Sequence, residues 1–201
     1  MPAIRDCNFT AIDFESAGAA RGKTDVPVQI GMASWSIERG HHQTFVSYLA
    51  ADQDIQWSAQ KLHGIGKQEL THAPTLLSLW PECKARLGSA VVVAHGRGTE
   101  KRFLRSFPGH GFGPWVDTLP LSRALWPDLD DHSLGSICEQ LGLCAAVHEL
   151  VSGKTWHDAL FDAVASLVLL IHIIELHQIE GQDVEFLQHP DTHAWHQLRK
   201  H

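Results

Sequence analysis

The chain carries little positive charge. Sixteen lysines and arginines stand against 23 aspartates and glutamates, which gives a formal net charge of −7. Proteins that bind nucleic acid over a broad surface are usually basic, so this balance argues against such a surface. It does not exclude a site that holds a few phosphates through metal ions. Local positive charge does occur in two clusters, at 84–86 and 101–105. The alternative interpretation of both clusters is a solvent-exposed helix face.

Paired cysteines and long apolar runs are also missing. The four cysteines form no Cys-x-x-Cys pair, which argues against a structural zinc ribbon and favours small buried hydrophobic residues. No stretch reaches the roughly 18 apolar residues of a membrane span, and the longest candidate, 163–174, contains Ser166 and His172. The first residues show no charged segment followed by an apolar block. We therefore expect a cytoplasmic protein without membrane contacts.

The composition that is present suits one domain with a sizeable core, since 44% of the 201 residues are apolar and 19% are charged. We place this domain at 1–180 and interpret 181–201 as a C-terminal tail, helical and either packed on the domain or trailing from it. Alternating or β-branched runs predict the strands, which are 8–14, 26–38, 41–49, 90–95 and 115–119. The run 90–95 is apolar enough for a central strand buried on both faces.

Helices are predicted between and after these strands. The segments are 58–87 with breaks near 63–66 and at Pro74, 100–107 with Thr99 as N-cap, a helix up to Leu125, 133–141, and 156–178 with an apolar stripe. A tight hairpin at Arg39-Gly40 joins the second and third strands. Hairpin strands followed by alternating strands and helices predict an α/β fold with a mixed sheet.

The first chemically informative segment contains Asp13 and Glu15. On a strand, residues two apart point to the same face, so these two carboxylates lie side by side. They repel each other unless a cation lies between them, and hard ions such as Mg²⁺ and Mn²⁺ favour such oxygen ligands. A second segment, His95 to Glu100, follows the predicted central strand, where open α/β sheets place their sites. Glu100 has an alternative interpretation, as an acid that stabilises a helix start.

A third segment surrounds Asp162, which lies inside the apolar stripe of the last long helix. A carboxylate that faces a core is costly unless it is paired or bound to metal. His157 lies five positions earlier, and the two side chains meet only if His157 precedes the regular helix. This histidine is a candidate general base, with a helix cap or surface residue as the alternative.

Together these segments resemble the three motifs of the DnaQ-like (DEDDh) 3′–5′ exonucleases. The resemblance rests on Asp13-Phe14-Glu15, on Val93-Ala94-His95 with Glu100, and on His157 with Asp162-Ala163. Segments 62–65, 117–127 and 134–138 also resemble the family in order and spacing, so the match covers about residues 8–178. The second motif departs from the family pattern, which usually reads His-Asn-Ala-x-Phe-Asp. Here it reads His95-Gly96-Arg97-Gly98-Thr99-Glu100, so a glutamate occupies the aspartate position and the asparagine and phenylalanine are missing.

The resemblance implies a ribonuclease H-like fold with a five-stranded mixed sheet flanked by helices. It also implies two divalent cations, Mg²⁺ or Mn²⁺, and removal of nucleotides from nucleic-acid 3′ ends. By motif position, the metal-binding and catalytic residues would be Asp13, Glu15, Glu100 and Asp162, with His157 as general base. The substrate-binding residues would be Ser16, Ala17, Gly18, His63, Ile65, His95 and Arg97, of which Arg97 would contact phosphate.

Three functions remain open from the sequence. The leading one is a metal-dependent 3′–5′ exonuclease acting on single-stranded DNA or short RNA. The altered second motif motivates another, a catalytically weakened member that binds nucleic acid or a protein. The acidic charge motivates a third, a nuclease or phosphodiesterase for small nucleotides. The sequence decides neither DNA against RNA nor the presence of a homodimer or a polymerase partner.

Overall fold

A computed structural model describes residues 1–19, 22–190 and 193–199. Within these residues, five strands form one sheet in the order β3-β2-β1-β4-β5. Strands β2 and β3 run antiparallel to their neighbours, whereas β4 and β5 continue the sheet in parallel with β1. The predicted mixed sheet is therefore confirmed. Its strands are β1 (Phe9–Ser16), β2 (Pro27–Ser36), β3 (Gly40–Tyr48), β4 (Val91–Ala94) and β5 (Trp115–Asp117).

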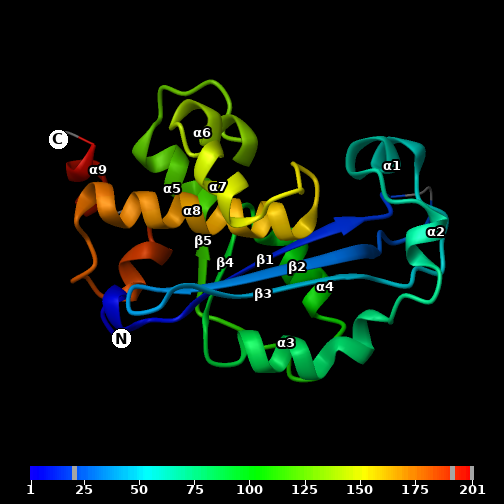
Figure 1. Cartoon of the computed structure of the whole chain (residues 1–201). Helices are drawn as coiled ribbons and strands as arrows, with labels where there is room; N and C mark the ends of the chain where they lie inside the picture. Colours follow the sequence, from blue (N-terminus) through cyan, green and yellow to red (C-terminus); the bar gives the residue numbers. More distant parts are fainter. Residues whose placement is uncertain (20–21, 191–192, 200–201) are drawn as a thin grey trace.

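Helices cover both faces of this sheet (Figure 1). Helix α8 crosses one face together with α5, α6 and α7, whereas α3 and α4 lie on the other, and α1 and α2 stand near the end of β1. The helices are α1 (Trp57–His63), α2 (Lys67–Leu70), α3 (Trp80–Leu87), α4 (Gly98–Leu104), α5 (Thr118–Leu125), α6 (Leu134–Gln140), α7 (Cys144–Leu150), α8 (Ala159–His177) and α9 (His193–Leu198). Short 3₁₀ helices are η1 (Ile4–Asp6), η2 (Leu76–Leu79) and η3 (Val184–Gln188).

Strand β1 divides its side chains between two cores, as its period of two requires. Ile12 and Phe14 pack with residues of α3 and α4. Phe9 and Ala11 pack in the core beneath α8. Asp13 and Glu15 lie on the same face of β1 as Phe9 and Ala11, so both carboxylates point to the face that α8 covers.

Small residues let the start of α8 approach the sheet closely. Gly31 pairs with Asp13 across β1 and β2. A Cβ atom added at Gly31 would lie 2.2 Å from the backbone of Ala159 and Leu160. The first turn of α8 therefore rests directly on β2, beside the two carboxylates of β1.

Helix α8 is also the core helix of the fold. It is long and apolar enough to cross a membrane by length and composition, yet 72% of its most apolar 18-residue window is buried here. Its apolar residues pack under α6 and α7 and against β1 and β2. The apolar stripe predicted from the sequence thus packs in the core of the domain.

The structure corrects several predicted boundaries. The fourth helix begins at Gly98 with Arg97, not Thr99, at its N-cap, and it ends at Leu104. The fifth strand stops at Asp117, whose side chain accepts the Leu119 N–H and starts α5. Helix α7 was not predicted. The long helix starts only at Ala159 because Asp158 caps it.

The described part of the 181–201 tail packs on the domain. The Ile4 N–H donates to the Gln182 carbonyl at 2.8 Å. Val184, Leu187 and Trp195 are buried in the core that contains α8. Residues 191–192 and 200–201 of the tail lie outside the described residues.

We predict that Gly31→Ala lowers the free energy of unfolding by about 1–3 kcal/mol, the usual cost of overpacking. The added methyl group must displace the backbone of α8 at Ala159, which also moves Asp162. Urea denaturation measures this change. Gly111→Ala is the control because a Cβ there meets nothing within 4 Å. Equal unfolding midpoints for the two variants would contradict the close contact.

Candidate active site

Three segments far apart in the sequence meet at the end of β1. One ligand atom each from Glu15, His157 and Asp162 lies within 4.8 Å of the other two. Asp13 lies beside them, since the charges of Asp162, Glu100 and Glu15 all act on its carboxyl group. The fold thus brings together the five residues predicted as catalytic. The individual roles assigned to them stay predictions.

His157 reaches this cluster because it lies before the regular helix. Its backbone is in the left-handed region with φ of 66°, and its N–H donates to Asp162 Oδ2 at 3.2 Å. This placement is needed for the two side chains to meet, because within a regular helix they would diverge. The imidazole is exposed, so water can reach it.

Glu100 enters the cluster from α4, and Asp117 holds the turn that carries it. The Asp117 carboxylate accepts the N–H groups of Gly96 at 2.8 Å and Arg97 at 3.1 Å. The turn between β4 and α4 is thereby fixed to the end of β5. Glu100 itself is only 5% exposed, and its Oε2 has no hydrogen-bond partner among the described residues.

Burial, and to a lesser degree the charges of nearby carboxylates, raise the pKa values of these carboxyl groups. Burial, then the charges of Asp162 and Asp158, raise the pKa of Glu15 to about 8. Burial raises the pKa of Asp162 to about 7, and burial raises the pKa of Glu100 to about 7. Burial, then the charge of Asp162, raises the pKa of Asp13 well above its usual value. Without a counterion, the cluster therefore favours protonated carboxyl groups near neutral pH.

The donor set fits divalent cations. Asp162 Oδ1, like Glu100 Oε2, is buried and has no hydrogen-bond partner among the described residues. Such oxygens are costly to bury unless something binds them. Carboxylate oxygens are the ligands that Mg²⁺ and Mn²⁺ prefer. Asp13, Glu15, Glu100 and Asp162 are the residues that could hold such ions.

A partly buried hydrogen-bond network, which the sequence pattern does not reveal, positions the start of α8. The Gln29 side chain donates to Asp158 Oδ2 at 3.1 Å and accepts the Ala159 N–H at 2.9 Å. Lys154 Nζ lies 2.6 Å from the same Asp158 oxygen. Asp158 Oδ1 accepts the N–H groups of Leu160 and Phe161. Gln29 is cross-strand partner to Glu15, so one residue fixes α8 directly beside the cluster.

The segment after β1 forms a wall of the site. His63 Nδ1 accepts the Ile65 N–H at 3.0 Å, so its Nε2 donates to the Ser16 carbonyl at 3.1 Å. Burial lowers the pKa of His63. The bond to the Ser16 carbonyl raises this pKa, and the charge of the nearby His157 lowers it. Both backbone polar groups of Ala17 are bonded within the fold, to Val26 and Gln56.

These contacts show how the residues predicted to bind substrate are held in the fold; their contact with a nucleotide stays a prediction. Ile65 and Ala17 are buried with their N–H groups already bonded, so they support the wall without offering these donors to a nucleotide. Gly18, with φ of 83°, is partly exposed at the same wall. Ser16 and His63 keep their place beside the cluster.

His95 and Arg97 are also bonded within the fold. The His95 ring donates from Nε2 to the His132 carbonyl at 2.8 Å and lies 2.9 Å from the Thr118 hydroxyl at Nδ1. Both ring nitrogens are therefore bonded within the fold, and the predicted contact of His95 with substrate stays a prediction. The Arg97 guanidinium bonds the Trp115 carbonyl at 3.3 Å and lies 3.9 Å from Asp117.

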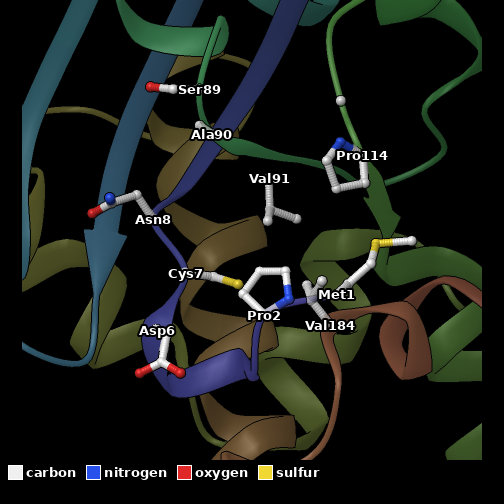
Figure 2. Close-up of a pocket in the computed structure, with 11 residues that line it drawn as sticks. Met1, Pro2, Asp6, Cys7, Asn8, Ser89, Ala90, Val91, Pro114 and Val184 are labelled. Atoms are coloured by element: carbon white, nitrogen blue, oxygen red, sulfur yellow. The ribbon is translucent and has the colours of Figure 1, made fainter.

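A separate cavity lies away from the acidic cluster. It has a volume of about 280 Å³ and lies where β1 and β4 begin, whereas the acids lie toward the end of β1. Figure 2 shows Met1, Pro2, Cys7 and Val91 around it. Its lining is mainly apolar, and none of the five predicted catalytic residues contributes to it.

Comparison with known proteins decides the family. A family model described as an exonuclease (RNase_T) matches residues 10–170. The chain belongs to the DnaQ-like 3′–5′ exonuclease family. This confirms the predicted family and the ribonuclease H-like fold, and it places the chain among the 3′–5′ exonucleases, which are hydrolases.

Two curated relatives illustrate the family. The PolC-type DNA polymerase III of Halalkalibacterium halodurans is 28% identical over 86% of this exonuclease-family chain, which spans 12% of that polymerase. The DNA polymerase III subunit epsilon of Aquifex aeolicus is 28% identical over 86% of this chain and 83% of its own length. The chain thus spans about an eighth of the PolC-type relatives but most of the epsilon subunit.

Solved structures show the same fold. Exonuclease X in complex with 5′ overhanging duplex DNA has a TM-score of 0.69 at 23% identity, covering 86% of this chain and 96% of the other. The nuclease domain of 3′hExo, a DEDDh family member bound to rAMP, has a TM-score of 0.67 at 16% identity, covering 87% and 94%.

We predict that Asp162→Asn is more stable than the native chain at pH 8.5 in EDTA, but not at pH 5. The raised pKa of Asp162 means that the folded state binds more protons than the unfolded state between about pH 4 and 7. Its contribution to the free energy of unfolding therefore falls as pH rises through this window. Thermal melting across the pH range measures the difference.

Comparing the native chain with Asp162→Asn cancels the contributions of histidines such as His63 and His95, because both proteins contain them. The lowered pKa values of these histidines make the free energy of unfolding rise with pH, opposite to the effect of Asp162. A melting-temperature difference that does not change with pH would contradict the assignment. Saturating Mg²⁺ should favour the native chain over Asp162→Asn, because only the native site keeps all four carboxylates.

We predict that Gln29→Met lowers the free energy of unfolding by about 1–3 kcal/mol, since it leaves the buried Ala159 N–H without a partner and removes one of the donors to Asp158. It should also weaken Mn²⁺ binding measured by calorimetry, because the start of α8 is no longer fixed. Gln43→Met, at an exposed position of β3, is the matched control. Unchanged Mn²⁺ affinity in Gln29→Met would show that the network does not position the cluster.

Proposed function

We propose that this chain is a metal-dependent 3′–5′ exonuclease that releases nucleoside monophosphates from the 3′ end of single-stranded DNA or short RNA. One observation carries the proposal: Asp13, Glu15, Glu100 and Asp162 converge in a partly buried cluster beside the exposed His157. Membership of the exonuclease family supports it. So do the names of two structural neighbours, one solved with DNA and the other with rAMP.

His157 is the proposed general base. Its imidazole is exposed to solvent on one side and adjoins Glu15 and Asp162 on the other, so it can take a proton from a water molecule held at the cluster. The bond from its N–H to Asp162 keeps it in place. The scissile phosphate would lie between this imidazole and the carboxylates.

Asp13, Glu15 and Asp162 would hold two divalent cations, with Glu100 in the position of the second-motif acid. When bound, Mg²⁺ or Mn²⁺ would supply activation of water and stabilisation of the leaving oxygen. Other residues of the chain orient these carboxylates. Gln29 and Asp158 fix the start of α8, which carries Asp162, and Asp117 fixes the turn that precedes Glu100. The buried and unpartnered Oε2 of Glu100 supports a ligand role for the longer side chain.

The same glutamate motivates a second candidate function. A member that binds nucleic acid or a protein without cleaving would keep the fold but lose productive metal geometry. A polymerase partner is a further proposal, supported by the names of the relatives, which are components of DNA polymerase III.

We predict that the chain shortens 5′-labelled 12-mers from the 3′ end in Mg²⁺ or Mn²⁺. His157→Gln should lower the rate by roughly 10²–10⁴-fold, the usual loss with a general base. Denaturing gels of DNA and RNA 12-mers measure the ladder. His196→Gln, an exposed histidine of α9, is the matched control and should cleave normally.

No shortening by the native chain, together with binding of the same 12-mer, would favour the non-cleaving alternative. An unaltered ladder in His157→Gln would remove this residue from the proposed mechanism.

A further inference from the structure

An exposed tryptophan stands on α1 beside the site. Trp57 is 74% exposed, the most exposed of the large hydrophobic residues in the described part of the chain. Single exposed apolar residues are common and need no explanation by themselves. Trp57, however, carries a cation on its ring: Lys61 Nζ, one helical turn further along, lies 5.2 Å from the ring centroid.

Both ends of α1 are tied to the wall of the site. The Gln56 N–H, immediately before Trp57, donates to the Ala17 carbonyl at 2.7 Å. At the other end, His63 donates to the Ser16 carbonyl. Figure 1 shows α1 standing over the end of β1, on the same side of the sheet as α8. Helix α1, which carries the exposed Trp57 at its start, therefore packs on the wall that follows Glu15, with His63 at its other end near His157.

The distance along α1 from His63 to Trp57 exceeds the length of one nucleotide. Trp57 and His63 are six residues apart, which is about 9 Å along a helix axis. A ligand confined to the acidic cluster and His63 would not extend along the whole of α1. A strand that continues from the cluster along α1 would.

Building on the proposed function, we propose that Trp57 and Lys61 form a platform for a single nucleic-acid strand beyond its terminal nucleotide. A base stacks on the exposed indole, and the Lys61 ammonium attracts the adjoining phosphate. Aromatic rings interleaved with basic side chains are the usual means of holding single strands without sequence preference. The substrate class that follows is a polymer, in preference to small nucleotides, even though the net charge of the chain is negative.

The experiment compares binding of a fluorescein-labelled dT12 with binding of TMP, measured by anisotropy and by competition. It uses Mn²⁺ in a His157→Gln background, which keeps the four carboxylates and slows cleavage. Adding Trp57→Ala should weaken dT12 binding about tenfold relative to TMP binding, since it removes the ring on which one base stacks. Trp57→Phe should restore most of the loss. Lys61→Gln should reduce the salt dependence of dT12 binding by about 0.7 in the log–log slope.

Leu77→Ala is the matched control, because Leu77 is 56% exposed but lies in η2. Equal dT12 affinity in Trp57→Ala and Leu77→Ala would overturn the platform. The two proposals fail separately. Cleavage by the native chain without a Trp57 effect removes only the platform, whereas a Trp57-dependent dT12 complex that is never cleaved removes only the exonuclease.

Discussion

The contact between the first turn of α8 and β2 is the constraint on which the site depends. Gly31 leaves room for the backbone of Ala159, and Gln29 bonds both Ala159 and the capping Asp158. With the helix held there, Asp162 faces the two carboxylates of β1, and His157 is placed just before the helix begins. A side chain larger than hydrogen at position 31 would separate these groups.

This arrangement opposes the stability of the domain. Four carboxyl groups share one partly buried region, and their pKa values rise chiefly because burial disfavours the ionised forms, with the charges of nearby carboxylates adding to the shift. The large apolar core around α8 compensates for the repulsion. Bound cations would remove it, which links the proposed chemistry to the stability of the fold.

The second motif shows how one altered residue can be accommodated locally. Glu100 is longer than the aspartate of the family pattern, yet its carboxylate is buried and still reaches the neighbourhood of Asp13. Asp117 holds the preceding turn through two backbone N–H groups, while Arg97 is bound to Asp117 and the Trp115 carbonyl. The substitution therefore changes the reach of one acid but leaves the surrounding turn anchored.

The sequence alone determined the features that depend on local periodicity. The period of two placed Asp13 and Glu15 on one face of a strand. The helical stripe identified Asp162 as a carboxylate among apolar neighbours. Only the tertiary structure revealed Gln29 and Gly31, because their partners lie about 130 residues away and leave no local pattern. Likewise, it showed that His95 and Ile65 use their polar groups within the fold. Such pairings depend on how distant elements pack, and periodicity within one element carries no information about them.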